Sequence, residues 1–182
     1  MNTKLRELTI LALLSAFMLI FGYLEKLFPL VPALPAVKLG LSNIVLIFAL
    51  ALLNMRAAWS LVFVKILLGG ILYMGPVGTL LAALGTAAST LVMASLLKRR
   101  AMRLTGISVA GSVAHMLAQL LAQGFLIGFW AVLGYAPILL ISSLASGIFI
   151  GYLSRLVLLH MSKIIPEYRD KLDKIGVIED GK

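Results

Sequence analysis

Three hydrogen-bonding side chains recur at every fourth position of an otherwise apolar stretch: His115, Gln119 and Gln123. In an α-helix this spacing places all three on one face. Such a column could line a polar pocket, or it could join packed membrane helices, since Gln and His hydrogen-bond across helices in lipid. Three such residues in register favour the pocket, and we expect them to contact a ligand.

Lys65 lies inside a second apolar stretch with no acidic residue near it in the sequence. It stands about eight residues, or about 12 Å, from the expected cytoplasmic end of a helix. The side chain could extend toward the headgroups or pair with the distant Glu25. Alternatively it is a buried cation for an anionic ligand group, because ionisable residues inside a bilayer are costly and face a cavity or a partner.

A third polar group, Lys38, Ser42 and Asn43, follows the proline-rich stretch 29–35. Short apolar segments with polar ends are typical of the binding regions of transporters. A single lysine at the membrane surface can also simply reach the outer headgroups, where Glu25 and Lys26 are expected too. The predicted substrate-binding residues are Lys38, Asn43, Lys65, His115, Gln119 and Gln123.

The composition identifies the solvent that surrounds these residues. Of 182 residues, 62% are hydrophobic and 13% are charged, whereas a soluble domain carries about 25% charged residues. So little polar surface predicts an all-α integral membrane protein in which the lipid bilayer contacts most of the chain. The absence of cysteine excludes disulfides.

Six apolar runs are long enough, or nearly so, to cross a bilayer, which takes about 20 residues. No Asp, Glu, Lys or Arg occurs between Leu104 and Ser154, so this stretch is expected to form two spans that turn at residues 134–137. A transmembrane domain at 1–161 would precede a cytoplasmic tail at 162–182, which forms either an amphipathic helix on the inner leaflet or a solvated tail. The predicted spans are residues 8–28, 39–53, 57–73, 77–97, 107–133 and 138–160.

The positive charges give an independent test of six spans. With that count, every basic connection falls on one side, and the other side holds only Lys26 and Lys38. Loops rich in Lys and Arg stay in the cytoplasm, so both termini are predicted to be cytoplasmic. Because the bases alternate with apolar runs, the net charge of +9 indicates membrane orientation and no nucleic-acid partner.

Motifs for several chemistries are missing from the sequence. It contains no Walker-type glycine loop with Lys-Ser/Thr, no HExxH and no GxSxG. The first aspartate is Asp170, although Mg²⁺-diphosphate chemistry normally needs carboxylates on the metal. We therefore expect no catalysis by this chain, no metal site and no cofactor.

Three features together resemble a known group: Ala12-Leu-Leu-Ser-Ala16, the proline-containing loop, and Val37-Lys38-Leu-Gly-Leu-Ser-Asn43. With the six runs, they resemble the substrate-binding S components of energy-coupling factor (ECF) transporters. The chain is most similar to the family called heptaprenyl diphosphate synthase component I, or Gx transporter family. This resemblance implies an S-component-like bundle in a prokaryotic cell membrane that binds a small vitamin-like or precursor molecule.

The resemblance also implies partners. The face with Ala12 and Ala16 would dock on a T-type transmembrane subunit, and two cytoplasmic ATPases would bind the ATP. Two other functions stay open at this point. The chain could be a non-catalytic membrane accessory subunit of a polyprenyl diphosphate synthase or quinone-pathway enzyme, or an anchor whose polar residues only hold helices together.

Overall fold

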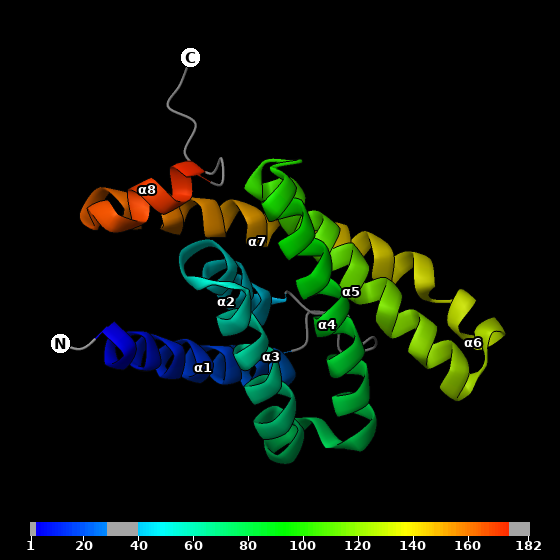
Figure 1. Cartoon of the computed structure of the whole chain (residues 1–182). Helices are drawn as coiled ribbons and strands as arrows, with labels where there is room; N and C mark the ends of the chain where they lie inside the picture. The colour runs from blue at the N-terminus through cyan, green and yellow to red at the C-terminus, as the bar shows by residue number, and fades with distance from the viewer. Residues whose placement is uncertain (1–2, 29–39, 175–182) are drawn as a thin grey trace.

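A computed structural model describes residues 3–28 and 40–174, and all of its elements are helical (Figure 1). Lys38 and the proline-rich stretch lie outside the described residues. The elements are α1 (Thr3–Leu27), α2 (Leu41–Phe48), the π-helical turn η1 (Ala49–Leu53), α3 (Met55–Gly69), the π-helical turn η2 (Gly70–Met74), α4 (Gly75–Arg99), α5 (Leu104–Ile127), α6 (Phe129–Leu133), α7 (Ala136–Ile164) and α8 (Pro166–Lys174).

Four helical segments in the described residues are long and apolar enough to cross a membrane: Leu5–Leu27, Met55–Arg99, Leu104–Ile127 and Ala136–Ile164. The segment Leu41–Leu53 is apolar but shorter. The 45-residue segment Met55–Arg99 changes direction at Gly75, where φ is 70°, and its two arms lie side by side in Figure 1. For the described residues, the prediction of an all-helical fold with helices long and apolar enough to span a membrane is confirmed.

Local sequence explains where these helices begin and end. Asn54 separates η1 from α3, and its side-chain oxygen accepts a hydrogen bond of 2.9 Å from the Ala57 N–H, as a helix N-cap does. Gly75 adopts the left-handed φ that lets the chain reverse, and Pro76 fits the first turn of α4. Both breaks fall where the sequence predicts them.

The connection after α5 differs from the sequence prediction. The helix was expected to continue through residue 133, but it ends at Ile127 because Gly128 has a φ of 91°. The short α6 follows, and α7 begins at Ala136 with Pro137 in its first turn. A proline-containing turn was predicted here, whereas the stop at Gly128 depends on a backbone angle that other residues rarely adopt.

Helix α5 packs against both α4 and α7. On α7, Gly147 and Gly151 lie against the α5 backbone, such that a Cβ at these positions would fall 2.8 Å from Val109 Cα and 2.7 Å from Thr105 Cα. In lipid, small residues permit this close approach, and van der Waals contacts then hold the helices together. The α5 face that carries His115 is thus fixed relative to α7.

Helix α1 leaves one face uncovered. Ala12 and Ala16 are exposed there, together with Leu8, Leu13 and Phe17. On the other side of α1, Met18 is 1% exposed and belongs to the core. The residues that the resemblance assigns to a partner are therefore accessible on the molecular surface.

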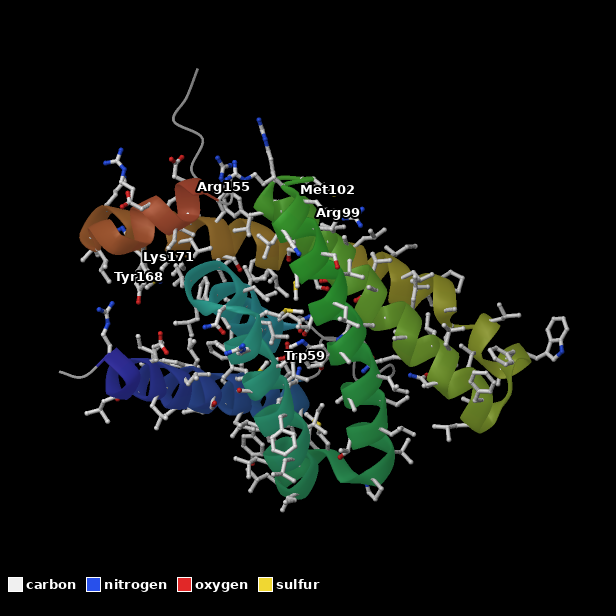
Figure 2. The ribbon with its side chains drawn as sticks, viewed as in Figure 1. Trp59, Arg99, Met102, Arg155, Tyr168 and Lys171 are labelled. Carbon is white, nitrogen blue, oxygen red and sulfur yellow. The ribbon has the colours of Figure 1, made fainter. Side chains whose placement is uncertain are left out.

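Helix α8 packs on the bundle, and the location of the tail relative to the membrane stays a prediction. Tyr168 and Leu172 are buried, and the Lys171 ammonium donates a 3.1 Å hydrogen bond to the Leu52 carbonyl at the end of η1. Figure 2 labels Tyr168 and Lys171 on α8. Carbonyls at the C-terminal end of a helix lack intrahelical partners and favour a cation. The tail segment 166–174 thus packs against the C-terminal end of η1.

Candidate ligand-binding site

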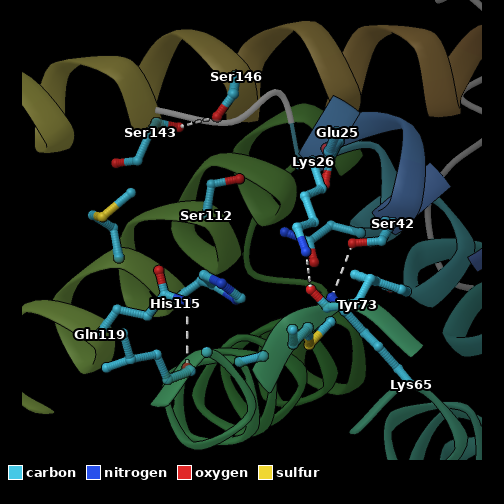
Figure 3. Close-up of a pocket in the computed structure, with 18 of the residues that line it drawn as sticks. Glu25, Lys26, Ser42, Lys65, Tyr73, Ser112, His115, Gln119, Ser143 and Ser146 are labelled. Atoms are coloured by element: carbon cyan, nitrogen blue, oxygen red, sulfur yellow. Dashed lines mark hydrogen bonds between the residues drawn. The ribbon is translucent and has the colours of Figure 1, made fainter. Parts of the chain in front are cut away.

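A cavity of about 510 Å³ lies among the helices, within the volume range of small-molecule sites (Figure 3). Residues from α1, α2, α3, η2, α4, α5 and α7 line it, so it exists only when most of the chain has folded. The lining residues include Gly22, Glu25, Lys26, Gly40, Ser42, Asn43, Lys65, Tyr73, Met74, Gly78, Leu81, Ala82, Ser112, His115, Met116, Gln119, Gln123, Ser143 and Ser146.

Lys65 of α3 lies at one side of this cavity and is 5% exposed. Its ammonium donates to the Ser42 hydroxyl of α2 at 2.9 Å and to the Thr86 hydroxyl of α4 at 3.4 Å. The side chain is therefore buried between helices and does not extend over the outer surface. Both of these hydrogen-bond acceptors are neutral, so they solvate the ammonium without cancelling its charge.

Glu25 and Lys26, at the end of α1, join three elements around the cavity. The Glu25 carboxylate accepts a hydrogen bond from the Leu41 N–H at the start of α2, and the Lys26 ammonium donates to the Tyr73 carbonyl in η2. An anion at a helix N-terminus and a cation at the C-terminal end of a helical turn are both favoured by the helix dipole. From the sequence, both residues were expected at the membrane surface, with Glu25 also a possible distant partner of Lys65.

The predicted column on α5 faces the same cavity. Gly85 of α4 makes room for it, because a Cβ there would lie 2.9 Å from both His115 Nε2 and Gln119 Cγ. The Gln119 amide donates to the Leu81 carbonyl at 3.3 Å, and the Gln123 oxygen accepts from the Tyr135 hydroxyl at 2.8 Å. The column thus lines the cavity and also joins neighbouring elements, so the two sequence-based alternatives coexist.

Three serines complete this side of the cavity, and they were not among the predicted binding residues. Ser112 precedes His115 by three residues, so it extends the same face of α5. Ser143 and Ser146 have the same spacing on α7, where their hydroxyls donate to carbonyls of their own helix. That spacing was the available signal, but serines are frequent wherever membrane helices pack.

Two further buried polar atoms at the cavity have no hydrogen-bond partner within the described residues: Asn43 Oδ1 and the Tyr73 hydroxyl. The Tyr73 hydroxyl lies close to Gly22 and Gly69, where a Cβ would collide with it. An unsatisfied buried polar atom costs about 1–3 kcal/mol.

The fold therefore brings Asn43, Lys65, His115, Gln119 and Gln123 to one cavity. Their role in binding a ligand stays a prediction. In the described ranges 3–28 and 40–174, no three His, Asp or Glu side chains gather in a way that could hold a metal ion.

Helices long enough to span a membrane, arranged around a polar cavity, define a helical membrane protein with an internal site. The chain belongs to the family described as heptaprenyl diphosphate synthase component I, whose model matches residues 14–157, which confirms the resemblance to that family. The matched region includes every residue that lines the cavity. The family description names one component of a synthase and so implies a partner component. Comparisons with curated proteins and with solved structures gave no match.

Proposed function

We propose that the chain is the membrane-embedded substrate-binding S subunit of an ECF-type transporter that takes up a small vitamin-like or precursor molecule. One observation carries this proposal: a buried lysine and a column of imidazole and amide groups line the same cavity. Intramembrane ionisable residues that face a cavity mark the pathways and sites of transported molecules. The chain itself is proposed to be non-catalytic and to bind neither ATP nor another cofactor.

The proposed topology has six spans: α1, α2 with η1, α3 with η2, α4, α5 and α7. It places the start of α1, the α4–α5 turn and α8 at the cytoplasm of a prokaryotic cell. In Figure 1 these parts lie in the upper and left half, while the α3–α4 turn and α6 lie toward the lower right. The basic residues Lys98, Arg99, Arg100 and Arg103 lie at the α4–α5 turn, in agreement with cytoplasmic positive charge.

The proposed partners are a T-type transmembrane subunit and two cytoplasmic ATPases. The exposed face of α1 supports the first contact, because Ala12 and Ala16 would let a partner helix approach the backbone closely. In a complex of this kind, ATP hydrolysis by the partners would drive release of the ligand on the cytoplasmic side.

Ligand capture tests the proposal directly. The protein is purified in lipid nanodiscs, bound small molecules are extracted, and their amount per protein is measured by mass spectrometry. Lys65→Ala removes a charge-assisted contact and His115→Ala a neutral one, so the affinities are expected to fall about 10–100-fold and about tenfold. Lys98→Ala, at an exposed position, is the control. Equal ligand content in the wild type and in both cavity variants would refute the site.

A second function follows from the family description, which names a synthase component. In this alternative the chain is an accessory membrane subunit that holds a soluble polyprenyl diphosphate synthase at the bilayer. It predicts co-purification with a prenyltransferase and faster product formation when the chain is present. The transport proposal predicts neither, so pull-down and enzyme assays with the two purified proteins separate the alternatives.

A further inference from the structure

The charges around the cavity do not balance. Among the described residues, the formally charged side chains that line it are Glu25, Lys26 and Lys65, which sum to one positive charge when His115 is neutral. Glu25 and Lys26 both bind backbone groups at the ends of helices. A net charge inside a membrane protein is costly, and a single negative charge in the cavity would remove it.

The hydrogen-bond donors indicate where that negative charge would lie. The Ser42 hydroxyl accepts from Lys65, so its own hydrogen is free to point at a bound oxygen atom. The Lys65 ammonium and the Ser42 hydroxyl are 2.9 Å apart and both residues line the cavity, so the two groups can bind one oxyanion together.

The opposite side of the cavity has a different chemistry. Figure 3 shows Ser112, His115, Gln119, Ser143 and Ser146 apart from the group formed by Glu25, Lys26, Ser42, Tyr73 and Lys65. With a neutral imidazole, the first group presents hydroxyl, amide and ring nitrogen atoms without formal charge. Such groups recognise neutral donors and acceptors, for example those of a polar ring.

We infer that this cavity selects a monoanion whose single negative group binds Lys65 and Ser42, and whose neutral polar part faces His115 and Gln119. This inference rests on the proposed function, because it assumes that the cavity binds a transported molecule. It excludes cations, which Lys65 would repel. It also excludes diphosphates, because they carry at least two negative charges and Glu25 lines the same cavity.

The test uses the full chain in nanodiscs and three probes from one low-molecular-mass cell extract: its anionic, neutral and cationic fractions, separated by ion exchange. A bound ligand raises the unfolding temperature by mass action. The anionic fraction alone is expected to raise it, by at least about 2 °C at a few times the Kd. Mass spectrometry of the molecule retained by the protein then counts its charges, and one negative charge is expected.

Three variants test whether the rise in unfolding temperature depends on Lys65 and Ser42. Lys65→Gln is expected to abolish the shift and Ser42→Ala to reduce it, while Lys98→Gln, with the same loss of charge at an exposed position, keeps it. The fraction assay on the wild-type protein decides the charge class even when Lys65→Gln does not fold. An equal shift in a folded Lys65→Gln protein overturns the assignment of the anion to Lys65.

The other outcomes are equally decisive. A shift with the neutral or cationic fraction, or a retained molecule with two or more negative charges, overturns the monoanion inference and leaves the proposed function intact. If no fraction shifts the unfolding temperature and no molecule is retained, both the inference and the proposed function fail.

Discussion

The close contact of α7 with the α5 backbone at Gly151 gives the first prediction. In Gly151→Ala, the new methyl group on α7 would lie 2.7 Å from Thr105 Cα of α5 and 2.9 Å from Ser108 Cβ. The first of these atoms belongs to the backbone, so no side-chain rotation can relieve the contact. Helices α5 and α7 must separate instead.

The size of the effect follows from this geometry. The distance to Thr105 Cα is about 0.7 Å short of ordinary carbon contact, so the whole interface must shift by a similar amount. Overpacking of this kind costs about 1–3 kcal/mol, and a backbone contact belongs in the upper half of that range. The higher helix propensity of alanine offsets up to about 1 kcal/mol. The net loss of stability is therefore about 1–2 kcal/mol.

Thermal unfolding in detergent or nanodiscs measures this loss as a Tm lower by about 2–8 °C. Gly134→Ala is the matched control, because the nearest atom to its new methyl group lies 3.7 Å away and its φ of −61° suits alanine. The control should be neutral or slightly stabilising. The double variant Gly147→Ala/Gly151→Ala should cost less than the sum of the single variants, since one separation of the helices relieves both contacts. A Gly151→Ala protein as stable as the wild type would refute this account of the α5–α7 interface.

Three other substitutions test separate parts of the structure. Gly85→Ala places a methyl group 2.9 Å from His115 Nε2 and Gln119 Cγ. It should therefore lower the affinity for the molecule that co-purifies with the wild type, which is measured as the amount of that molecule per protein. The helix content measured by circular dichroism should stay the same. Leu172→Ala removes a side chain that is fully buried between α8 and η1; it should lower the free energy of unfolding in a denaturant titration by about 2–4 kcal/mol, and a value below 0.5 kcal/mol would mean that α8 is not docked. Asn54→Ala deletes the N-cap of α3 and should lower the free energy of unfolding by about 1 kcal/mol in the same titration. Asn54→Asp should keep most of the stability that the cap provides.

Part of the candidate site could be predicted from the sequence because helical geometry is local. With 3.6 residues per turn, His115, Gln119 and Gln123 must share a face wherever the helix packs. A lysine inside an apolar run is conspicuous for the same local reason, since no lipid-facing position tolerates it well. The wall positions Tyr73, Glu25 and Lys26 had no such signal. They reach the cavity through contacts between α1, α2 and η2 that no spacing along the chain encodes.

The sequence alone predicted the lipid environment and the all-helical class, because hydropathy is summed over neighbouring residues and needs no knowledge of packing. It could not decide which helix faces meet. That depended on contacts between distant residues, such as Gly151 with Thr105 and Gly85 with His115, where the lack of a side chain on one helix admits the other. Only the tertiary structure therefore shows that Lys65 contacts Ser42 and Thr86, and that the polar residues around Lys65 and those around His115 line one cavity. The physical reason is that close packing acts over a few ångströms in space and has no fixed relation to distance along the chain.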